Sequence, residues 1–456
     1  MRCGAAEVRL ELPVGVPMMG YGARVGTAIA EHDPLHARAL YLEAGGRALL
    51  VQLEVCLLAV PQSDALRAAL ARRTGLATGE IWLAASHTHS GPETGMAASL
   101  AGRALPEWMG PVHDAVVDAA VRAVATAVPA RAGLGRAPVE IGRNRREPGG
   151  AIDPEAVVLR VDRLSGSPLA VAFVHGTHPT VLGHENLQWS ADWPGAAAAR
   201  LREAFPDAVP IFLLGAHGDV DPRTRGLQDL AVPGQSRGVG FAVCEALGRE
   251  VGDAVVAAAE TLRGEDLPIA SHATRVPTAV HGGGEGEAAH EKALRRRAIE
   301  AAVALGLDPD APLGVARALA LERERTEGLS RDEARERLAR VRLFVRDRTA
   351  ARVAGGRVAD VGVQCLHVGE AAWLGLPAEA TAELGLAWKA GRPPGSALLS
   401  NVGGWLRYLP HPERFRAPHG HHHYEVLMST LEPAAGLRLL AAGAALADAG
   451  GRPALG

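Results

Sequence analysis

The sequence predicts a mixed α/β (α+β) fold in which helices flank a β-sheet core. Short apolar runs alternate along the chain with alanine-rich segments of helical periodicity. Of the 456 residues, 48% are hydrophobic and 22% charged, which is enough apolar material for a large core. The length would allow two or three domains; we expect a single catalytic domain over residues 1–456.

The expected elements follow from these runs. Helices are expected where apolar residues recur at helical spacing, and strands where a short apolar run is bounded by polar or turn residues. The expected strands cover residues 47–60, 80–85, 155–164, 168–182 and 209–222, and the expected helices cover 63–73, 193–205 and 238–262.

Residues 285–348 differ from the rest of the chain. They combine dense charge of both signs with helical periodicity, which predicts a solvent-facing helical insertion within the domain. The alternative is a lid or a dimerisation arm, so the sequence leaves open whether the protein forms a homo-oligomer.

The charge balance and the N-terminus limit the partners. A net charge of −3 gives no reason to expect nucleic acid. The first residues lack the apolar segment of a signal peptide, and no uninterrupted apolar stretch is long enough to span a bilayer. We therefore expect a cytoplasmic protein without stable membrane insertion, in which Cys56 and Cys365 are buried free thiols.

Polar side chains gather where four of the apolar runs end. The segments are "SHTHSGP" (86–92), "VHGTHPTVLGHE" (174–185), "GAHGDVDPR" (215–223) and "LPAE" (376–379). Loops beyond the carboxyl ends of strands are where α/β folds place their ligand sites. Histidines and carboxylates at four such ends predict a metal-centred site, with the ligand types of a catalytic zinc.

His87 and His89 are one residue apart at the first of these ends. On a strand, alternate side chains leave the backbone on the same side, so both rings are expected to face the site. His175 reads as a core histidine of its strand, and His184 and His217 as loop residues outside the ligand set. The tract "HGHHHYE" (419–425) reads as a solvated loop.

The ordered motifs resemble the catalytic domain of the neutral/alkaline, non-lysosomal ceramidases and their bacterial relatives. The resemblance runs over nearly the whole chain. It is carried by "GVPMMGYGAR" (15–24), "SHTHSGP", "NRRE" (144–147), "THPTVLG", "GDVDP", "LPAE", "GGWLRYLPHPERF" (403–415) and "HYE" (423–425).

This resemblance implies one Zn²⁺ and an amide-cleaving reaction. The zinc ligands implied are His87, His178, Glu379 and Tyr408. His89 is implied as the histidine that handles protons beside the zinc-activated water. The remaining implied catalytic residues, Arg145 and Tyr424, would hold or polarise the amide carbonyl.

The chain also departs from the family pattern. Asp221, in "GDVDP", stands where the ceramidases have a serine, and a carboxylate cannot replace that hydroxyl donor at neutral pH. Asp221 could instead recognise a cationic substrate group, act as a base or help to hold a second metal, and Asp219 either binds substrate or caps a turn. The family's C-terminal immunoglobulin-like domain and secretion signal are not expected. These departures predict a small, polar N-acyl substrate rather than ceramide.

Two other functions remain open from the sequence. One is a dinuclear metallo-hydrolase that acts on an ester or phosphoester through Asp219, Asp221 and the histidines. The other is a catalytically inactive binding protein that keeps the zinc pocket. A base beside the metal is unnecessary for mere binding, so His89 favours an enzyme.

Overall fold

A computed structural model describes residues 1–21, 24–225, 239–280, 330, 358–416 and 423–450. Apart from Ser330, the predicted insertion at 285–348 lies outside these residues. Residues 419–422 of the histidine tract lie outside them as well.

The largest sheet has eight strands in the order β11-β9-β8-β6-β1-β3-β4-β5. Its strands pair antiparallel except at the two edges, where β11 runs parallel to β9 and β5 parallel to β4. They are β1 (Arg2–Arg9), β3 (His36–Ala44), β4 (Gly46–Leu53), β5 (Ile81–Ala85), β6 (Val128–Pro138), β8 (Glu155–Arg163), β9 (Pro168–His175) and β11 (Val209–Leu214).

A second sheet has four strands in the order β13-β14-β15-β17. They are β13 (Ile269–Ala279), β14 (Val358–Val368), β15 (Ala371–Gly375) and β17 (Ala397–Leu399). β13 and β14 pair antiparallel from Ile269–Val368 to Ala279–Val358. Residues 280–357, which include the predicted insertion, therefore join neighbouring ends of two paired strands.

The eight-stranded sheet is bent in its middle. Only two residue pairs, Arg2–Pro129 and Cys3–Val128, join its halves at β1 and β6. The edge strands β5 and β11 contact each other although they are farthest apart in strand order. Its two halves and the four-stranded sheet thus form three walls around one apolar core, to which Leu40, Leu159 and Trp373 contribute.

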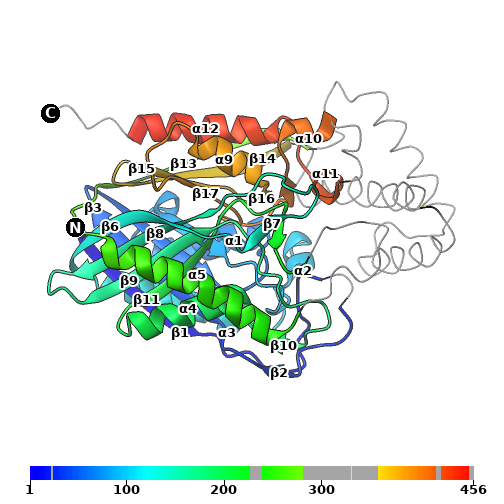
Figure 1. Ribbon diagram of the computed structural model, residues 1–456, viewed down its shortest axis with the longest axis horizontal. Coiled ribbons are helices and arrows are strands. Elements are labelled where there is room, and N and C mark those ends of the chain that lie inside the picture. The colour runs from blue at the N-terminus through cyan, green and yellow to red at the C-terminus, as the bar shows by residue number, and fades with distance from the viewer. Residues whose placement is uncertain (22–23, 226–238, 281–329, 331–357, 417–422, 451–456) are drawn as a thin grey trace.

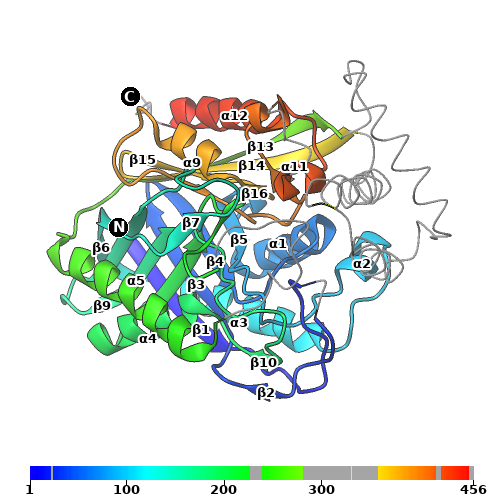
Figure 2. The same ribbon diagram turned by 45° about the vertical axis from the view of Figure 1, so that its right-hand side comes forward.

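Helices cover the outer face of each wall (Figures 1 and 2). The half containing β1, β3, β4 and β5 packs on α1 (Val60–Thr74) and α3 (Met109–Ala125). The other half packs on α4 (Trp193–Ala204) and α5 (Phe241–Thr261). The four-stranded sheet packs on α9 (Ala382–Lys389) and α12 (Ala435–Gly450), which lie at the top of both views.

Short elements complete the described chain. Three pairs of short strands, β2–β10, β7–β12 and β16–β18, connect loops around the larger sheets. The bounds are β2 (Ala30–Glu31), β7 (Gly142–Asn144), β10 (Gln188–Trp189), β12 (Val220–Pro222), β16 (Glu379–Ala380), β18 (Tyr408–Leu409), η1 (Thr78–Glu80), α2 (Met96–Leu100), α10 (Pro412–Arg416) and α11 (Tyr424–Met428).

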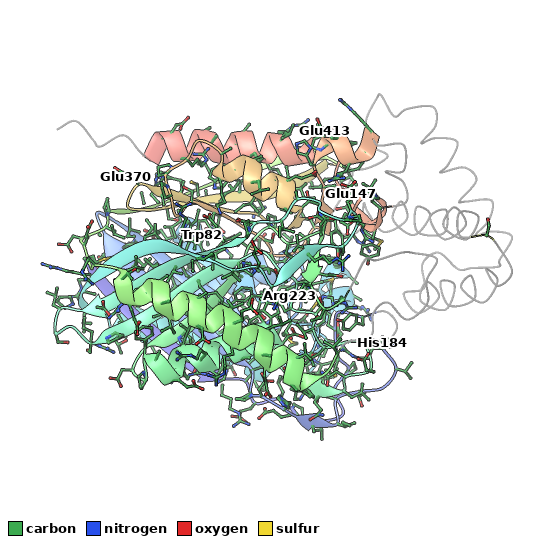
Figure 3. The ribbon with its side chains drawn as sticks, viewed as in Figure 1. Trp82, Glu147, His184, Arg223, Glu370 and Glu413 are labelled. Atoms are coloured by element: carbon green, nitrogen blue, oxygen red, sulfur yellow. The ribbon has the colours of Figure 1, made fainter. Side chains whose placement is uncertain are left out.

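Trp82 shows how closely the half-sheet that contains β5 packs against the four-stranded sheet. Its side chain, labelled in Figure 3, is buried between β5 and the four-stranded sheet. Its indole N–H donates to Ser271 Oγ at 3.0 Å. A Cβ added to Gly375 would come within 2.6 Å of the Trp82 ring, so glycine at that position allows the close approach.

The predicted mixed α/β class is confirmed, with helices on the outside of the sheet core. The expected strands at 168–182 and 209–222 end earlier than predicted, at His175 and Leu214. The residues beyond them form loops and the short strand β12. Cys56 and Cys365 are buried free thiols, as expected. Within the described ranges, no helix is both long and apolar enough to cross a membrane.

Candidate metal centre

Four strand ends meet at one place in the molecule. His178 lies three residues beyond the last residue of β9, and His217 lies three residues beyond the last residue of β11. Since the parallel strands β9 and β11 end in register, the two histidines lie side by side, with ring centroids 4.4 Å apart. His87 follows β5, and Glu379 follows β15 and opens β16.

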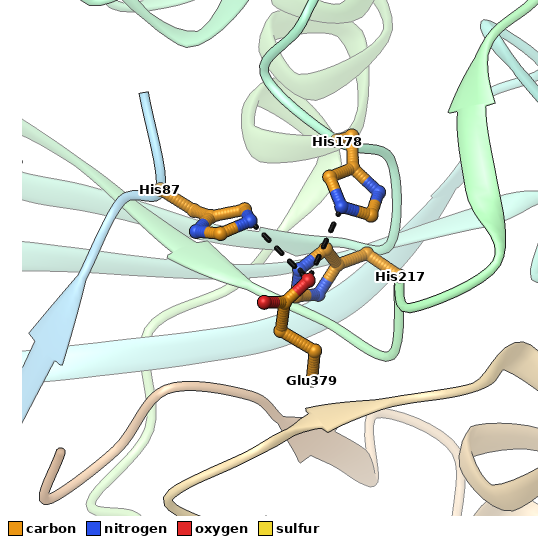
Figure 4. A group of neighbouring side chains, drawn as sticks. All are labelled: His87, His178, His217 and Glu379. Atoms are coloured by element: carbon orange, nitrogen blue, oxygen red, sulfur yellow. Dashed lines mark ion pairs between the residues drawn. The ribbon is translucent and has the colours of Figure 1, made fainter. Parts of the chain in front are cut away.

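The three imidazoles converge on one carboxylate oxygen, as Figure 4 shows. Oε2 of Glu379 lies 3.4 Å from His87 Nε2, 3.3 Å from His178 Nε2 and 3.5 Å from His217 Nε2. All four side chains are buried, and their ligand atoms lie within 4.8 Å of one another. This His₃Glu group is hereafter the metal centre.

Backbone carbonyls fix the orientation of each imidazole in the metal centre. Nδ1 of His87 lies 3.0 Å from the carbonyl oxygen of Cys56. The corresponding distances are 3.0 Å from His178 to Val220 and 3.1 Å from His217 to Gly215. An Nδ1–H that donates to a carbonyl leaves the Nε2 lone pair for the centre, which is the arrangement that metal-binding histidines adopt.

The predicted reason for the position of His87 is wrong. β5 ends at Ala85, and His87 has a φ of 68°, so strand alternation does not bring His87 and His89 to one side. The backbone instead turns through the left-handed region, which is unusual for a residue other than glycine. The His87 N–H donates to the carbonyl of Val55 at 3.0 Å, which holds this turn against the end of β4.

Glu379 is oriented by a tryptophan. Trp405 Nε1 donates to Glu379 Oε1 at 2.8 Å, so Oε2 is the oxygen that faces the histidines. Glycine at position 218 lets the loop that carries His217 approach β16, because a Cβ there would lie 2.7 Å from the Glu379 carbonyl oxygen. The Gly218 N–H donates to the Ala380 carbonyl at 2.8 Å.

The atoms at the centre fit a metal ion. Among the described residues, Nε2 of His178, Nε2 of His217 and Oε2 of Glu379 are buried without a hydrogen-bond partner. Leaving buried polar atoms unpaired costs free energy, so atoms that converge in this way indicate a ligand. Neutral imidazole and ionised carboxylate are the donors that Zn²⁺ and other divalent transition metals bind.

The electrostatics favour the ligand forms of Glu379 and the proton-accepting form of His89. Burial alone would raise the pKa of the Glu379 carboxyl, but His87, His178 and His217 hold it well below its usual range. Burial, followed by the neighbouring imidazoles of His87 and His178, lowers the pKa of His89 well below its usual value. Glu379 is therefore ionised and His89 neutral at physiological pH.

His89 lies beside the metal centre without being one of its four converging groups. Its Nε2 is 3.3 Å from Nε2 of His87, and the two rings are nearly perpendicular. His89 also belongs to a second group of possible ligand atoms, with Cys56 and His87. His89 therefore lies next to the His₃Glu set rather than within it.

The predicted catalytic arginine is held between two carboxylates. Arg145 Nη1 lies 3.1 Å from Asp221 Oδ1, and its Nε donates to Glu425 Oε1 at 2.8 Å. Its Nη2 donates to the Gly218 carbonyl at 2.7 Å. Arg146 also bonds Glu425. Glu425, at the end of the tract predicted to be a solvated loop, is instead buried in α11 and fixes Arg145 beside the loop that carries His217.

Asp221 is paired with protein cations in this structure. Besides Arg145, its carboxylate lies 3.8 Å from His178 Nδ1 and 4.0 Å from Arg225 Nε. Burial alone would raise the pKa of Asp221, but Arg145 and Arg225 lower it below its usual value. An ionised Asp221 therefore contributes to holding Arg145 in place.

The two predicted tyrosines lie together near Arg145. Tyr408 pairs in register with Glu379 in the parallel strands β18 and β16, and its ring centroid is 5.3 Å from that of Tyr424. The Arg145 guanidinium carbon lies 5.6 Å and 5.7 Å from the two ring centroids. Burial and Glu379 raise the pKa of Tyr408 well above its usual value.

His217 does not occupy the place that the sequence suggested, and Asp219 is held by hydrogen bonds within the protein. Asp219 accepts hydrogen bonds from Asn144 Nδ2 at 2.9 Å and from the Ala382 N–H at 2.8 Å, and burial raises its pKa to about 6. His217, read as a loop residue outside the ligand set, belongs to the metal centre. The sequence could have indicated His217 as a ligand, because His178 and His217 both follow apolar runs at corresponding distances.

We expect Trp405→Phe to weaken metal binding about 10- to 100-fold, which is typical when a residue that orients a metal ligand is lost. Without the indole N–H, Glu379 Oε1 loses its partner and the carboxylate can rotate. Zinc affinity measured by competition with a chelator tests this. Trp388→Phe is the control, because Trp388 donates to the Ala372 carbonyl away from the metal centre. Equal affinity in the two variants would contradict the prediction.

The comparisons with known proteins point in one direction. No protein-family model matches the chain. Neutral ceramidase A of Dictyostelium discoideum is 28% identical over 173 residues, which cover 32% of this chain and only 24% of that protein.

Two solved structures match nearly the whole chain. A neutral ceramidase from Pseudomonas aeruginosa has a TM-score of 0.69 at 19% identity, covering 98% of this chain and 74% of that one. A ceramidase complexed with C2 gives the same TM-score and identity and covers 98% and 75%. The chain therefore has the fold of the neutral ceramidases.

Proposed function

We propose that the protein is a zinc-dependent hydrolase that cleaves the amide bond of a small N-acyl compound. The observation that carries the proposal is the metal centre, where three imidazole nitrogens converge on Glu379 Oε2 with no other partner for two of them among the described residues. Its relatives are ceramidases by name, and ceramide is itself an N-acyl amide, which supplies the reaction class.

His87, His178 and Glu379 would hold the zinc, and either His217 or Tyr408 would be the fourth ligand. We favour His217, because its Nε2 lies 3.5 Å from Glu379 Oε2 and a neutral imidazole can bind the metal without losing a proton. The Tyr408 phenol lies next to Glu379 in the strand register, but it would have to lose its proton to bind zinc as a phenolate. When bound, zinc lowers the pKa of a coordinated water and polarises a carbonyl.

The chain's own residues would supply proton transfer and carbonyl orientation. A neutral His89 can accept the proton of the attacking water and return it to the leaving nitrogen. Arg145 and Tyr424 would donate hydrogen bonds toward the carbonyl oxygen as it gains negative charge. Each well-placed donor of this kind is worth roughly 3–4 kcal/mol.

The substrate is proposed to be smaller and more polar than ceramide. Asp221 stands in place of the family serine and is ionised and paired with Arg145 and Arg225. A charged group at this position favours a polar substrate over a long-chain lipid, because an apolar chain cannot replace the solvation that a carboxylate needs.

The first test measures zinc content and hydrolysis together in the wild type, His87→Ala, His217→Ala and Tyr408→Phe. We expect about one zinc per chain, cleavage of at least one member of a panel of N-acyl amines and N-acyl amino acids, and loss of both in His87→Ala and His217→Ala. Tyr408→Phe is expected to keep its zinc. The control, His113→Ala, lies on α3, where His113 contacts Gln62.

Other results would change the assignment. Two metals per chain, with cleavage of esters or phosphoesters only, would favour the dinuclear hydrolase. Stoichiometric zinc without turnover of any substrate would favour a binding protein. A wild type that binds no metal when zinc is supplied would overturn the proposal. Zinc lost from Tyr408→Phe but retained in His217→Ala would exchange the roles of these two residues.

A further inference from the structure

His89 is held in an unusual way for a residue proposed to move protons. Its Nδ1 is buried and has no hydrogen-bond partner among the residues described. A base histidine is ordinarily oriented by a carboxylate or carbonyl at the nitrogen that does not react. The His89 N–H donates to the Pro179 carbonyl at 3.4 Å, but this backbone hydrogen bond does not constrain the ring.

The backbone of Gly20 covers the His89 ring instead. A Cβ added at Gly20 would lie 2.4 Å from Cγ of His89 and 2.7 Å from its Nδ1. Gly20 also has a φ of 114°, which side chains rarely allow. The segment is tied to the His89 loop, because Met18 forms a bridge with Pro92 and the Met19 N–H donates to the Gly91 carbonyl.

Tyr21 packs against the same imidazole. Its ring meets the His89 ring edge to face, with centroids 4.7 Å apart and an interplanar angle of 67°. Edge-to-face contacts of aromatic rings are directional, so they favour one ring orientation.

The Tyr21 hydroxyl is fixed by two hydrogen bonds, one that it donates and one that it accepts. It donates to the Leu182 carbonyl at 2.6 Å and accepts from Arg225 Nη1 at 2.7 Å. Arg225 also donates to the Thr180 carbonyl at 2.6 Å and lies 4.0 Å from Asp221. The Tyr21 ring is thereby anchored to the loop that follows β9 and carries His178.

We propose that Gly20 and Tyr21 are positioning residues that set the orientation of His89 by packing, in place of a hydrogen bond to its Nδ1. The proposal rests on the proposed function, in which His89 Nε2 must face the reacting groups. Without this packing the ring can rotate about its side-chain bonds, and Nε2 leaves its place 3.3 Å from His87 Nε2. Misplacing a reacting group by about 1 Å can cost around 100-fold in rate.

The test compares zinc-loaded Tyr21→Leu, Tyr21→Phe and Gly20→Ala with the wild type. We expect Tyr21→Leu to lower kcat about 10- to 100-fold with KM nearly unchanged, and Tyr21→Phe, which keeps the ring, to restore most of kcat. Zinc content should stay at the wild-type value in all of them. Tyr41→Phe, in the core of β3, is the control for loss of a hydroxyl.

Gly20→Ala has a matched control in Gly15→Ala. Both glycines have positive φ, 114° and 86°, but a Cβ at Gly15 would meet nothing within 4 Å. Backbone strain alone would affect the two variants equally, whereas contact with the His89 ring affects only Gly20→Ala. We expect kcat to fall in Gly20→Ala and to stay near the wild-type value in Gly15→Ala.

A second readout does not depend on turnover. In protein labelled with ¹³C at histidine Cε1, the His89 signal, assigned by its loss in His89→Gln, should shift or broaden in Tyr21→Leu. The signals of His87, His178 and His217 should stay in place. This outcome supports the positioning role even if no amide is hydrolysed. Failure of the proposed function can therefore be distinguished from failure of the positioning role.

Three results would overturn the positioning role. The first is an unchanged His89 signal with unchanged kcat in Tyr21→Leu, while the wild type hydrolyses amides. The second is loss of zinc from Tyr21→Leu, and the third is an equal loss of kcat in Gly20→Ala and Gly15→Ala. Either of the last two would assign Gly20 and Tyr21 a merely structural role.

Discussion

Replacing His89 by glutamine is expected to lower kcat for amide hydrolysis by about 100- to 10,000-fold, the usual contribution of a general base. Glutamine can still form hydrogen bonds, but it cannot accept a proton at neutral pH. Because His89 is outside the His₃Glu group, the zinc content should match that of the wild type. Steady-state kinetics and metal analysis on the same preparation measure both quantities.

His113→Gln is the control for this substitution, since it makes the same chemical change on α3. Loss of zinc from His89→Gln would show that His89 is a ligand, in keeping with the second group of Cys56, His87 and His89. A kcat within a few-fold of the wild type, with zinc retained, would show that a group other than His89 transfers the proton.

The second large effect concerns stability. Glu54→Gln is expected to lower the free energy of unfolding at neutral pH by about 3–5 kcal/mol, the usual cost of breaking a buried ion pair. Both Glu54 and Arg38 are almost fully buried, and Glu54 Oε1 pairs with Arg38 Nη1. Glu54 Oε2 also accepts from the His36 N–H at 2.7 Å. After substitution, Arg38 keeps only Glu7 as a carboxylate partner.

The same substitution should change the response to acid. Burial alone would raise the pKa of Glu54, but Arg38 and His36 outweigh it and hold the pKa at about 2, below its ordinary value of 4.5. The folded pKa is depressed, so the stabilisation is fully present above pH 4.5. It is lost as the pH falls from about 4.5 to about 2, because the unfolded chain takes up the proton first.

Urea unfolding followed by circular dichroism between pH 2.5 and 7 measures both effects. The stability of Glu54→Gln should fall less steeply below pH 4.5 than that of the wild type. Glu43→Gln is the control on the neighbouring strand, because Glu43 is only partly buried and pairs with Arg2 at 3.8 Å. Exposed pairs contribute about 0–1 kcal/mol. An acid response in Glu54→Gln as steep as in the wild type would show that Glu54 is not the group that titrates.

Much of the metal centre could be predicted from the chain alone. His87, His178 and Glu379 each follow an apolar run, and such runs identify buried strands whose ends carry functional loops. The resemblance to the ceramidases singled out these three side chains as ligands, and the structure places them together. The same reasoning could have included His217, which follows β11 as His178 follows β9.

Other features could not be predicted from sequence patterns. The bend at β1 and β6, which brings the edge strands β5 and β11 together, depends on how three sheets pack around one core. Strand alternation was the wrong reason for the position of His87, because that residue lies beyond the strand with positive φ.

The sequence by itself determined the α/β class, the strand ends that carry chemistry and the types of ligand, because hydrophobic periodicity and side-chain chemistry are local properties. Only the tertiary structure decided that Trp405 orients Glu379 and that Gly20 and Tyr21 cover His89. These contacts join residues far apart in the chain. Their geometry depends on packing, for which no local pattern exists.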